Sequence, residues 1–236
     1  MRIPWIVYAG TASSILPVVA GLLAHRRLTP ARRWILAWAA FVVLANLLTT
    51  LLAWQDRNNH WVNYLATPVA GGLALWALSH WQQSSLAALS MRLAVPLLAI
   101  TWIGIVVRFE NTKTFSLLAE PFAGLLVMAA ATYTLISRAF TETGNVLGQA
   151  WFWIALGLTL VSGLAVALPP TSYWLLARHP DLVVKAYEVK SALEILALLL
   201  IARGMLCPTP VSPFGGSFSR ASSPSPSSSS ASSSRW

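Results

Sequence analysis

The richest set of chemically active side chains lies on one apolar run near the C-terminus of the sequence. At about 100° per residue in a helix, Lys190, Ser191 and Glu194 fall within one narrow arc, together with Tyr187, whereas Glu188 points away from it. Lys190 and Glu194 are one helical turn apart, so they can pair and lower the cost of burying either charge. A charged stripe inside a membrane span predicts a binding site for a small ligand or a proton.

A further acid, Glu120, precedes Pro121 near the start of another apolar run and is an alternative partner for Lys190. Polar side chains in spanning helices usually face the interior of the bundle, so we expect them to share one cavity in its outer half. The competing interpretation is that they only hold the helices together. The expected cavity residues are Asn46, Asn63, Glu120, Lys190 and Glu194, with Ser191 on the stripe of the last two.

Other reactive residues stand in positions that argue against catalysis. Both aspartates, Asp56 and Asp181, lie between apolar runs, and no two histidines stand one helical turn apart. A serine nucleophile elbow and a glycine-rich phosphate loop are also missing from the sequence. The sequence therefore predicts no catalytic residue and no metal site, and it identifies no cofactor. The histidines are His25, His60, His80 and His179.

Composition defines the class of protein that must position these residues. Of 236 residues, 56% are hydrophobic and only 10% are charged, which excludes an ordinary soluble domain. The net charge of +9 comes from short clusters between long apolar runs, so nucleic acid is not the expected partner. The expected partner is the lipid bilayer.

Seven apolar runs are long enough, or nearly so, to cross a bilayer as helices of about 20 residues. They lack the strict alternation that a membrane β-barrel requires. The sequence therefore predicts an all-α, multi-pass bundle over residues 1–206. The expected spans are Trp5 to Ala24, Trp34 to Trp54, Trp61 to Trp81, Leu93 to Arg108, Phe115 to Ser137, Gln149 to Pro170 and Val184 to Met205, of which the fourth is short.

Basic residues in short loops indicate the orientation, because Lys and Arg are retained in the cytoplasm during insertion. The densest cluster, from His25 to Arg33, lies between the first two expected spans. The N-terminus is thus expected outside and the C-terminus inside, in a bacterial inner membrane. Most tryptophans fall near the ends of spans, whereas Trp38, Trp76 and Trp102 lie deeper and either pack between helices or face a ligand.

Residues 207–236 have a different composition, rich in Ser and Pro. Such a segment cannot bury enough apolar surface to offset its chain entropy, so a disordered cytoplasmic tail is expected. Cys207 is the only cysteine, which excludes a disulfide within the chain.

Short patches resemble a group of uncharacterised seven-helix bacterial membrane proteins. They are Asn59-His60-Trp61 with Thr67-Pro68, and Phe152-Trp153 with Gly157-Leu158 and Gly163. The resemblance implies a seven-helix membrane fold and brings no activity or functional residue with it.

Three functional classes follow from these observations. The first is a non-enzymatic sensor or transporter that binds a small ligand or proton between Glu120, Lys190 and Glu194. The second is an accessory or assembly subunit that packs against other membrane proteins or against copies of itself. The third is a lipid-modifying enzyme that uses loop residues at the outer surface, namely Asp56, Arg57, His60, Arg108 and Glu110.

Overall fold

The computed structural model describes residues 5–110, 116–142 and 144–208. Within these ranges the regular elements are all helices, as the composition predicts. Two of them are single 3₁₀ turns, His25–Arg27 and Val146–Gly148. The α-helices are α1 (Trp5–Ser13), α2 (Ile15–Leu23), α3 (Pro30–Trp54), α4 (His60–Ser79), α5 (Ser85–Phe109), α6 (Ala119–Thr141), α7 (Ala150–Arg178) and α8 (Pro180–Leu206).

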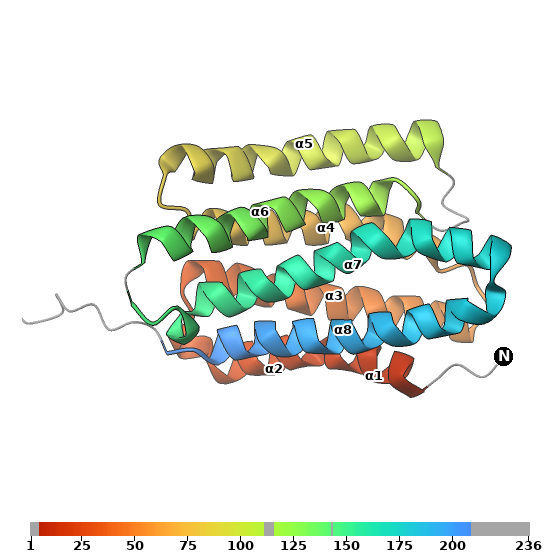
Figure 1. The fold of residues 1–236 in the computed structure, drawn as a ribbon, viewed down its shortest axis with the longest axis horizontal. Helices are drawn as coiled ribbons and strands as arrows, with labels where there is room; N and C mark the ends of the chain where they lie inside the picture. The colour runs from red at the N-terminus through yellow and green to blue at the C-terminus, as the bar shows by residue number, and fades with distance from the viewer. Residues whose placement is uncertain (1–4, 111–115, 143, 209–236) are drawn as a thin grey trace, which may run out of the picture.

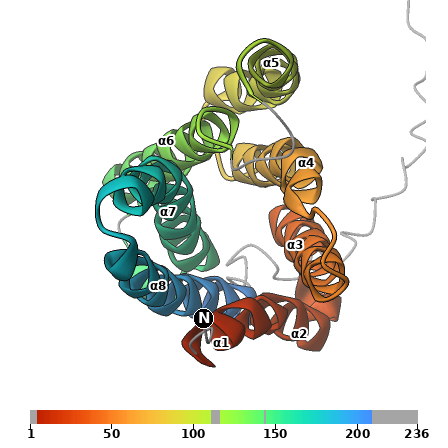
Figure 2. The same ribbon diagram turned by 90° about the vertical axis from the view of Figure 1, so that its right-hand side faces the viewer.

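The long helices run antiparallel to their neighbours in sequence, and α1 and α2 together form one further pass (Figure 1). Seen along the bundle, α2, α3, α4, α6, α7 and α8 form a ring, in which α8 closes against α1 and α2 (Figure 2). Helix α5 lies outside this ring and packs against α4 and α6. The ring of helices around the interior therefore passes directly from α4 to α6, and α5 is not part of it.

The two ends of the bundle are named after one charged residue at each. We call the end that holds the connection between α2 and α3 the Arg26 end, and the end that holds the connection between α3 and α4 the Asp56 end. Helix α1 begins at the Asp56 end, and α8 finishes at the Arg26 end (Figure 1).

Four helices, α3, α5, α6 and α7, are long and apolar enough to cross a membrane. Large apolar side chains also cover the outside of the bundle, with Val107 81% exposed and Phe140 88% exposed. A surface this apolar is unusual for a protein surrounded by water and is typical of one surrounded by lipid.

The first expected span is broken rather than continuous. It consists of α1 and α2, which are separated at Ser14. Pro17 cannot donate a backbone hydrogen bond to the carbonyl of Ser13 four residues earlier, so the α-helical pattern is interrupted there. At this break the hydroxyls of Ser13 and Ser14 donate to the carbonyls of Gly10 and Thr11, at 2.6 and 2.7 Å.

The fourth expected span is longer than the apolar run suggests. Helix α5 begins at Ser85, so it has 25 residues and needs no borrowed flanking segment. Its first two turns combine polar and apolar residues with good helix propensity, and they extend the helix beyond the purely apolar stretch.

Close packing of α7 against α8 depends on glycine. A Cβ atom on Gly157 would lie 2.5 Å from Ile201 Cγ1 and 2.7 Å from the carbonyl oxygen of Ala197. A Cβ on Gly204 would lie 2.5 Å from Ile154 Cγ1. Only glycine allows the two backbones to approach this closely, as in small-residue contacts between membrane helices.

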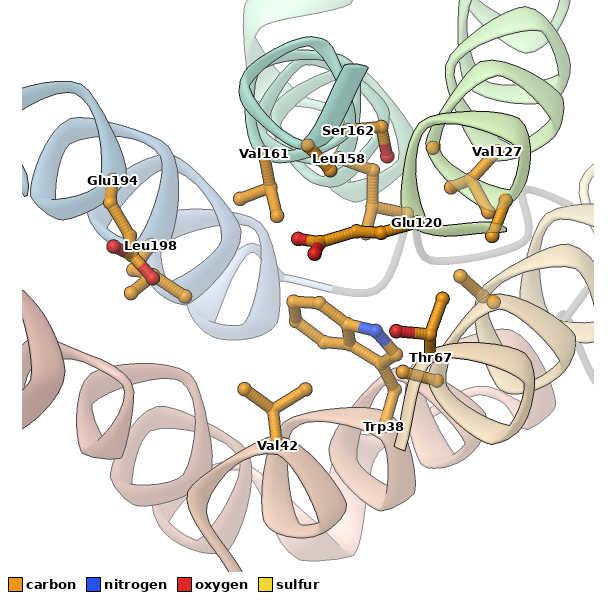
Figure 3. Close-up of a pocket in the computed structure, with 16 residues that line it drawn as sticks. Trp38, Val42, Thr67, Glu120, Val127, Leu158, Val161, Ser162, Glu194 and Leu198 are labelled. Carbon is orange, nitrogen blue, oxygen red and sulfur yellow. The ribbon is translucent and has the colours of Figure 1, made fainter. Parts of the chain in front are cut away.

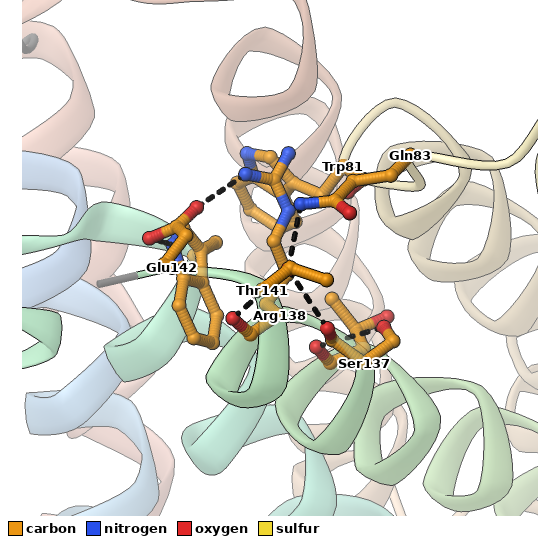
Figure 4. Close-up of polar contacts among 8 residues, drawn as sticks. Trp81, Gln83, Ser137, Arg138, Thr141 and Glu142 are labelled. Atoms are coloured by element: carbon orange, nitrogen blue, oxygen red, sulfur yellow. Dashed lines mark hydrogen bonds and ion pairs between the residues drawn. The ribbon is translucent and has the colours of Figure 1, made fainter. Parts of the chain in front are cut away.

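A polar cluster joins three parts of the chain at the Arg26 end (Figure 4). Arg138 forms an ion pair with Glu142 and donates through Nε to the carbonyl of Trp81 at 2.7 Å. The indole of Trp151 donates to Glu142 at 2.9 Å. The end of α6 is thereby fixed to the connection between α4 and α5 and to the start of α7.

Arg32 is a buried cation at the same end, with only 1% of its surface exposed. Its guanidinium donates to the carbonyls of Cys207 at 2.7 Å and of Met205 and Arg27 at 3.3 Å. A cation is favoured at a helix C-terminus, where carbonyl groups lack helical partners. Arg32 therefore caps α8 from α3. Of the expected tail, only residues 207 and 208 belong to the described part of the chain, and residues 209–236 lie outside it.

Candidate functional site

A cavity of about 160 Å³ lies at the centre of the ring, between α3, α4, α6, α7 and α8. This volume holds several waters or one small organic molecule. Its wall is mostly apolar, and its polar side chains come from four different helices. The polar and aromatic residues that line it are Trp38, Thr67, Glu120, Ser162 and Glu194.

Glu120 enters this pocket from the first turn of α6, and its carboxylate extends into the space that the indole of Trp38 on α3 also lines (Figure 3). Within the ranges that the structure describes, the Glu120 carboxylate makes no hydrogen bond or ion pair. The charges of Lys190, Glu110 and Glu194 all act on it. Glu120 is thus the polar group best placed to receive a ligand or proton.

The start of α6, which positions Glu120, is held by side chains rather than by a residue at the usual capping position. Glu110 accepts hydrogen bonds from the backbone amides of Leu118 and Ala119, at 2.5 and 3.2 Å. Ser116 donates to Glu110 and accepts from the Glu120 amide at 2.9 Å. A carboxylate at a helix N-terminus is favourable because the free amides there carry positive partial charge.

Glu194 reaches the same pocket from α8. Its carboxylate pairs with Lys190, with 2.9 Å between Oε2 and Nζ. Lys190 itself is not among the residues that line the pocket. Lys190 therefore pairs with the Glu194 carboxylate without lining the pocket itself.

The other expected cavity residues lie elsewhere. Ser191 is buried against α1, where a Cβ on Gly10 would be 3.1 Å from its own Cβ. Asn46 and Asn63 do not line the pocket, and their backbone carbonyls accept hydrogen bonds from Thr50 and Thr67. Of the expected cavity set, the structure brings Glu120 and Glu194 together.

Trp38 is one of the three deeper tryptophans whose roles the sequence left open. It is 5% exposed and lines the pocket, whereas Trp76 packs against Trp34 and lies under the Arg92 guanidinium. Thr67 and Ser162 were not singled out as site residues, because single hydroxyls are common in membrane helices and their helical faces cannot be assigned without the neighbouring helices.

The cavity owes its space to small residues on the facing helices. Gly71, Ala74, Ala123 and Gly124 line it on α4 and α6, and Ala165 lines it on α7. Pro169 lies inside α7 and cannot donate to the carbonyl of Ala165, so that carbonyl lacks its helical partner.

Glu110 is one of the loop residues that the lipid-modifying enzyme class would use, and in the structure it caps the start of α6. Asp56, Arg57 and Arg108 are exposed at the Asp56 end. In the described part of the chain, no group of three or more His, Cys, Asp or Glu residues could hold a metal ion.

The fold and pocket together define a helical bundle with an apolar exterior and an acidic interior cavity. No family model, curated protein or solved structure matches the chain. The resemblance to seven-helix bacterial membrane proteins therefore stays a prediction.

Proposed function

We propose that this chain is a multi-pass protein of a bacterial inner membrane, with seven spans, an outer N-terminus and a cytoplasmic C-terminus. The antiparallel run of the long helices along the bundle and the apolar exterior support this arrangement. Arg26, Arg27 and Arg33 are exposed at one end, which fits a cytoplasmic face.

Its function is to bind a small ligand or a proton in the central pocket, as a sensor or transporter. The observation that carries this proposal is the Glu120 carboxylate, which faces a cavity without a hydrogen bond or ion pair in the described part of the chain. An ionisable group within a membrane span is costly, so one that faces a cavity without a protein partner indicates a functional role.

The test compares the wild type with Glu120→Gln after purification of the full chain in mild detergent. Native mass spectrometry measures retained small molecules, and a pH-sensitive dye measures protons taken up after a pH jump. Glu188→Gln is the matched control, because Glu188 lies on α8 but does not line the pocket.

We expect Glu120→Gln, and not Glu188→Gln, to lose a retained molecule or a proton. Equal results for all three proteins would overturn the proposal. A fixed protein partner in every preparation, with no retained molecule, would favour the accessory-subunit class instead.

A further inference from the structure

We infer that the ligand of the central pocket is a small organic cation, a protonated or quaternary amine, held between the Glu120 carboxylate and the Trp38 indole. This inference rests on the proposed ligand-binding function and specifies the chemical class of the ligand.

Charge is the first argument. Among the described residues that line the pocket, Glu120 and Glu194 are the only ionisable side chains, and both are acids. Lys190 forms its ion pair with Glu194, so Glu120 is the pocket carboxylate without an ion pair in the described part of the chain. A cation would remove the cost of keeping this carboxylate ionised away from bulk water, whereas an anion would add to that cost.

The aromatic ring is the second argument. Glu120 and Trp38 both extend into the pocket, from α6 and α3 (Figure 3). Tryptophan attracts cations to its ring face more strongly than the other aromatic residues do, and the attraction grows when the site excludes water. The Trp38 side chain is held in place by burial, with 5% of its surface exposed.

The rest of the wall favours an organic cation over a bare metal ion. Metal ions such as Mg²⁺ and Ca²⁺ need about six or more oxygen ligands. The pocket offers two carboxylates and two hydroxyls, and most of its other lining residues are Ala, Gly, Val and Leu. The alkyl groups of an amine can contact these apolar residues while its charge faces Glu120.

The test uses the purified full chain in detergent and follows thermal unfolding with added probes. The cationic probes are methylammonium, tetramethylammonium and choline chlorides, which differ in size. The neutral probe is 3,3-dimethylbutan-1-ol, which has the shape of choline without its charge, and sodium chloride controls for ionic strength.

We expect at least one ammonium probe to raise the unfolding temperature, and the neutral probe and sodium chloride to leave it unchanged. Glu120→Gln and Trp38→Leu should each weaken binding of that probe at least ~10-fold, since each removes one attraction that acts in a site shielded from water. Glu188→Gln and Trp76→Phe are the matched controls, because neither residue lines the pocket.

The inference is overturned if no ammonium probe stabilises the wild type, or if the neutral probe stabilises it equally. This comparison needs no variant, so it holds even if Trp38→Leu does not fold. A neutral or anionic molecule retained in a Glu120-dependent manner would refute the cation while supporting the ligand-binding function. If no response of the protein depends on Glu120, both the cation and the ligand-binding function are refuted.

Discussion

Lys190 and Glu194 form an ion pair across one turn of α8, with 2.9 Å between the Lys190 Nζ and Glu194 Oε2 atoms. The lysine thus pairs with the acid on its own helix, although Glu120 on α6 was an alternative partner. Glu120 is left as the pocket carboxylate without an ion pair in the described ranges.

Lys190→Gln should raise the affinity of the pocket for an ammonium cation about threefold or more, because the positive charge beside Glu194 is lost and the pocket becomes more acidic. Titration with choline, followed by thermal unfolding, measures the change. Lys185→Gln is the control, since Lys185 is exposed on the same helix and has no ion pair among the described residues. An affinity that falls with Lys190→Gln would contradict the charge argument.

Arg32→Met should lower the free energy of unfolding by about 2–3 kcal/mol, because hydrogen bonds from a charged donor to the end of α8 are lost. Arg33→Met serves as the control, since Arg33 is exposed. Equilibrium unfolding in a denaturing detergent measures both variants, and equal stability of the two would show that the α8 cap contributes nothing.

Gly157→Ala should lower the free energy of unfolding by about 1–3 kcal/mol, because its Cβ would overlap the backbone of α8. Gly104→Ala on α5 should be neutral or slightly stabilising, since its Cβ would meet nothing within 4 Å. The same unfolding measurement compares the two. A neutral Gly157→Ala would mean that α7 and α8 are farther apart than the structure places them.

The orientation can be measured with introduced cysteines in a Cys207→Ser background, since Cys207 is the only native cysteine. A membrane-impermeant maleimide added to intact cells should label Gln55→Cys at the Asp56 end and leave Arg26→Cys unlabelled until the cells are opened. The reverse pattern would invert the proposed topology.

The native Cys207 should react slowly with maleimides at neutral pH. Burial raises the pKa of the Cys207 thiol, although the positive charges of Arg203 and Arg32 oppose this shift. Since the thiolate is the reactive form, labelling of the detergent-solubilised wild type should accelerate as the pH rises through and above the ordinary thiol pKa of about 8.5. A rate at neutral pH equal to that of a free thiol would contradict this expectation.

Features that depend on local spacing could be read from the sequence. The all-α class follows from the apolar runs, and the pairing of Lys190 with Glu194 follows from the four-residue spacing on one helix. Helix breaks were harder to locate, because the helix is interrupted near Pro17, whereas Pro68 and Pro96 lie inside helices α4 and α5.

Features that depend on how helices are placed relative to one another could not be read in this way. The displacement of α5 brings α4 beside α6, so Thr67 and Glu120 face one cavity while Asn63 does not line it. Glu110 caps the start of α6 although it lies eight residues before Leu118, and no local sequence pattern predicts that contact. Arg32 belongs to the basic cluster between the first two expected spans, yet two of its three acceptors, Met205 and Cys207, lie at the other end of the sequence.

The separation between Arg32 and the carbonyl groups that it caps also determines when the bundle can be completed. Met205 lies 173 residues after Arg32. At a synthesis rate of about 5–20 residues per second, the ribosome needs roughly 9–35 s to make that interval. Throughout this time the Arg32 guanidinium lacks the Met205 and Cys207 carbonyls and the ring lacks α8, so the central pocket cannot be completed before α8 is made.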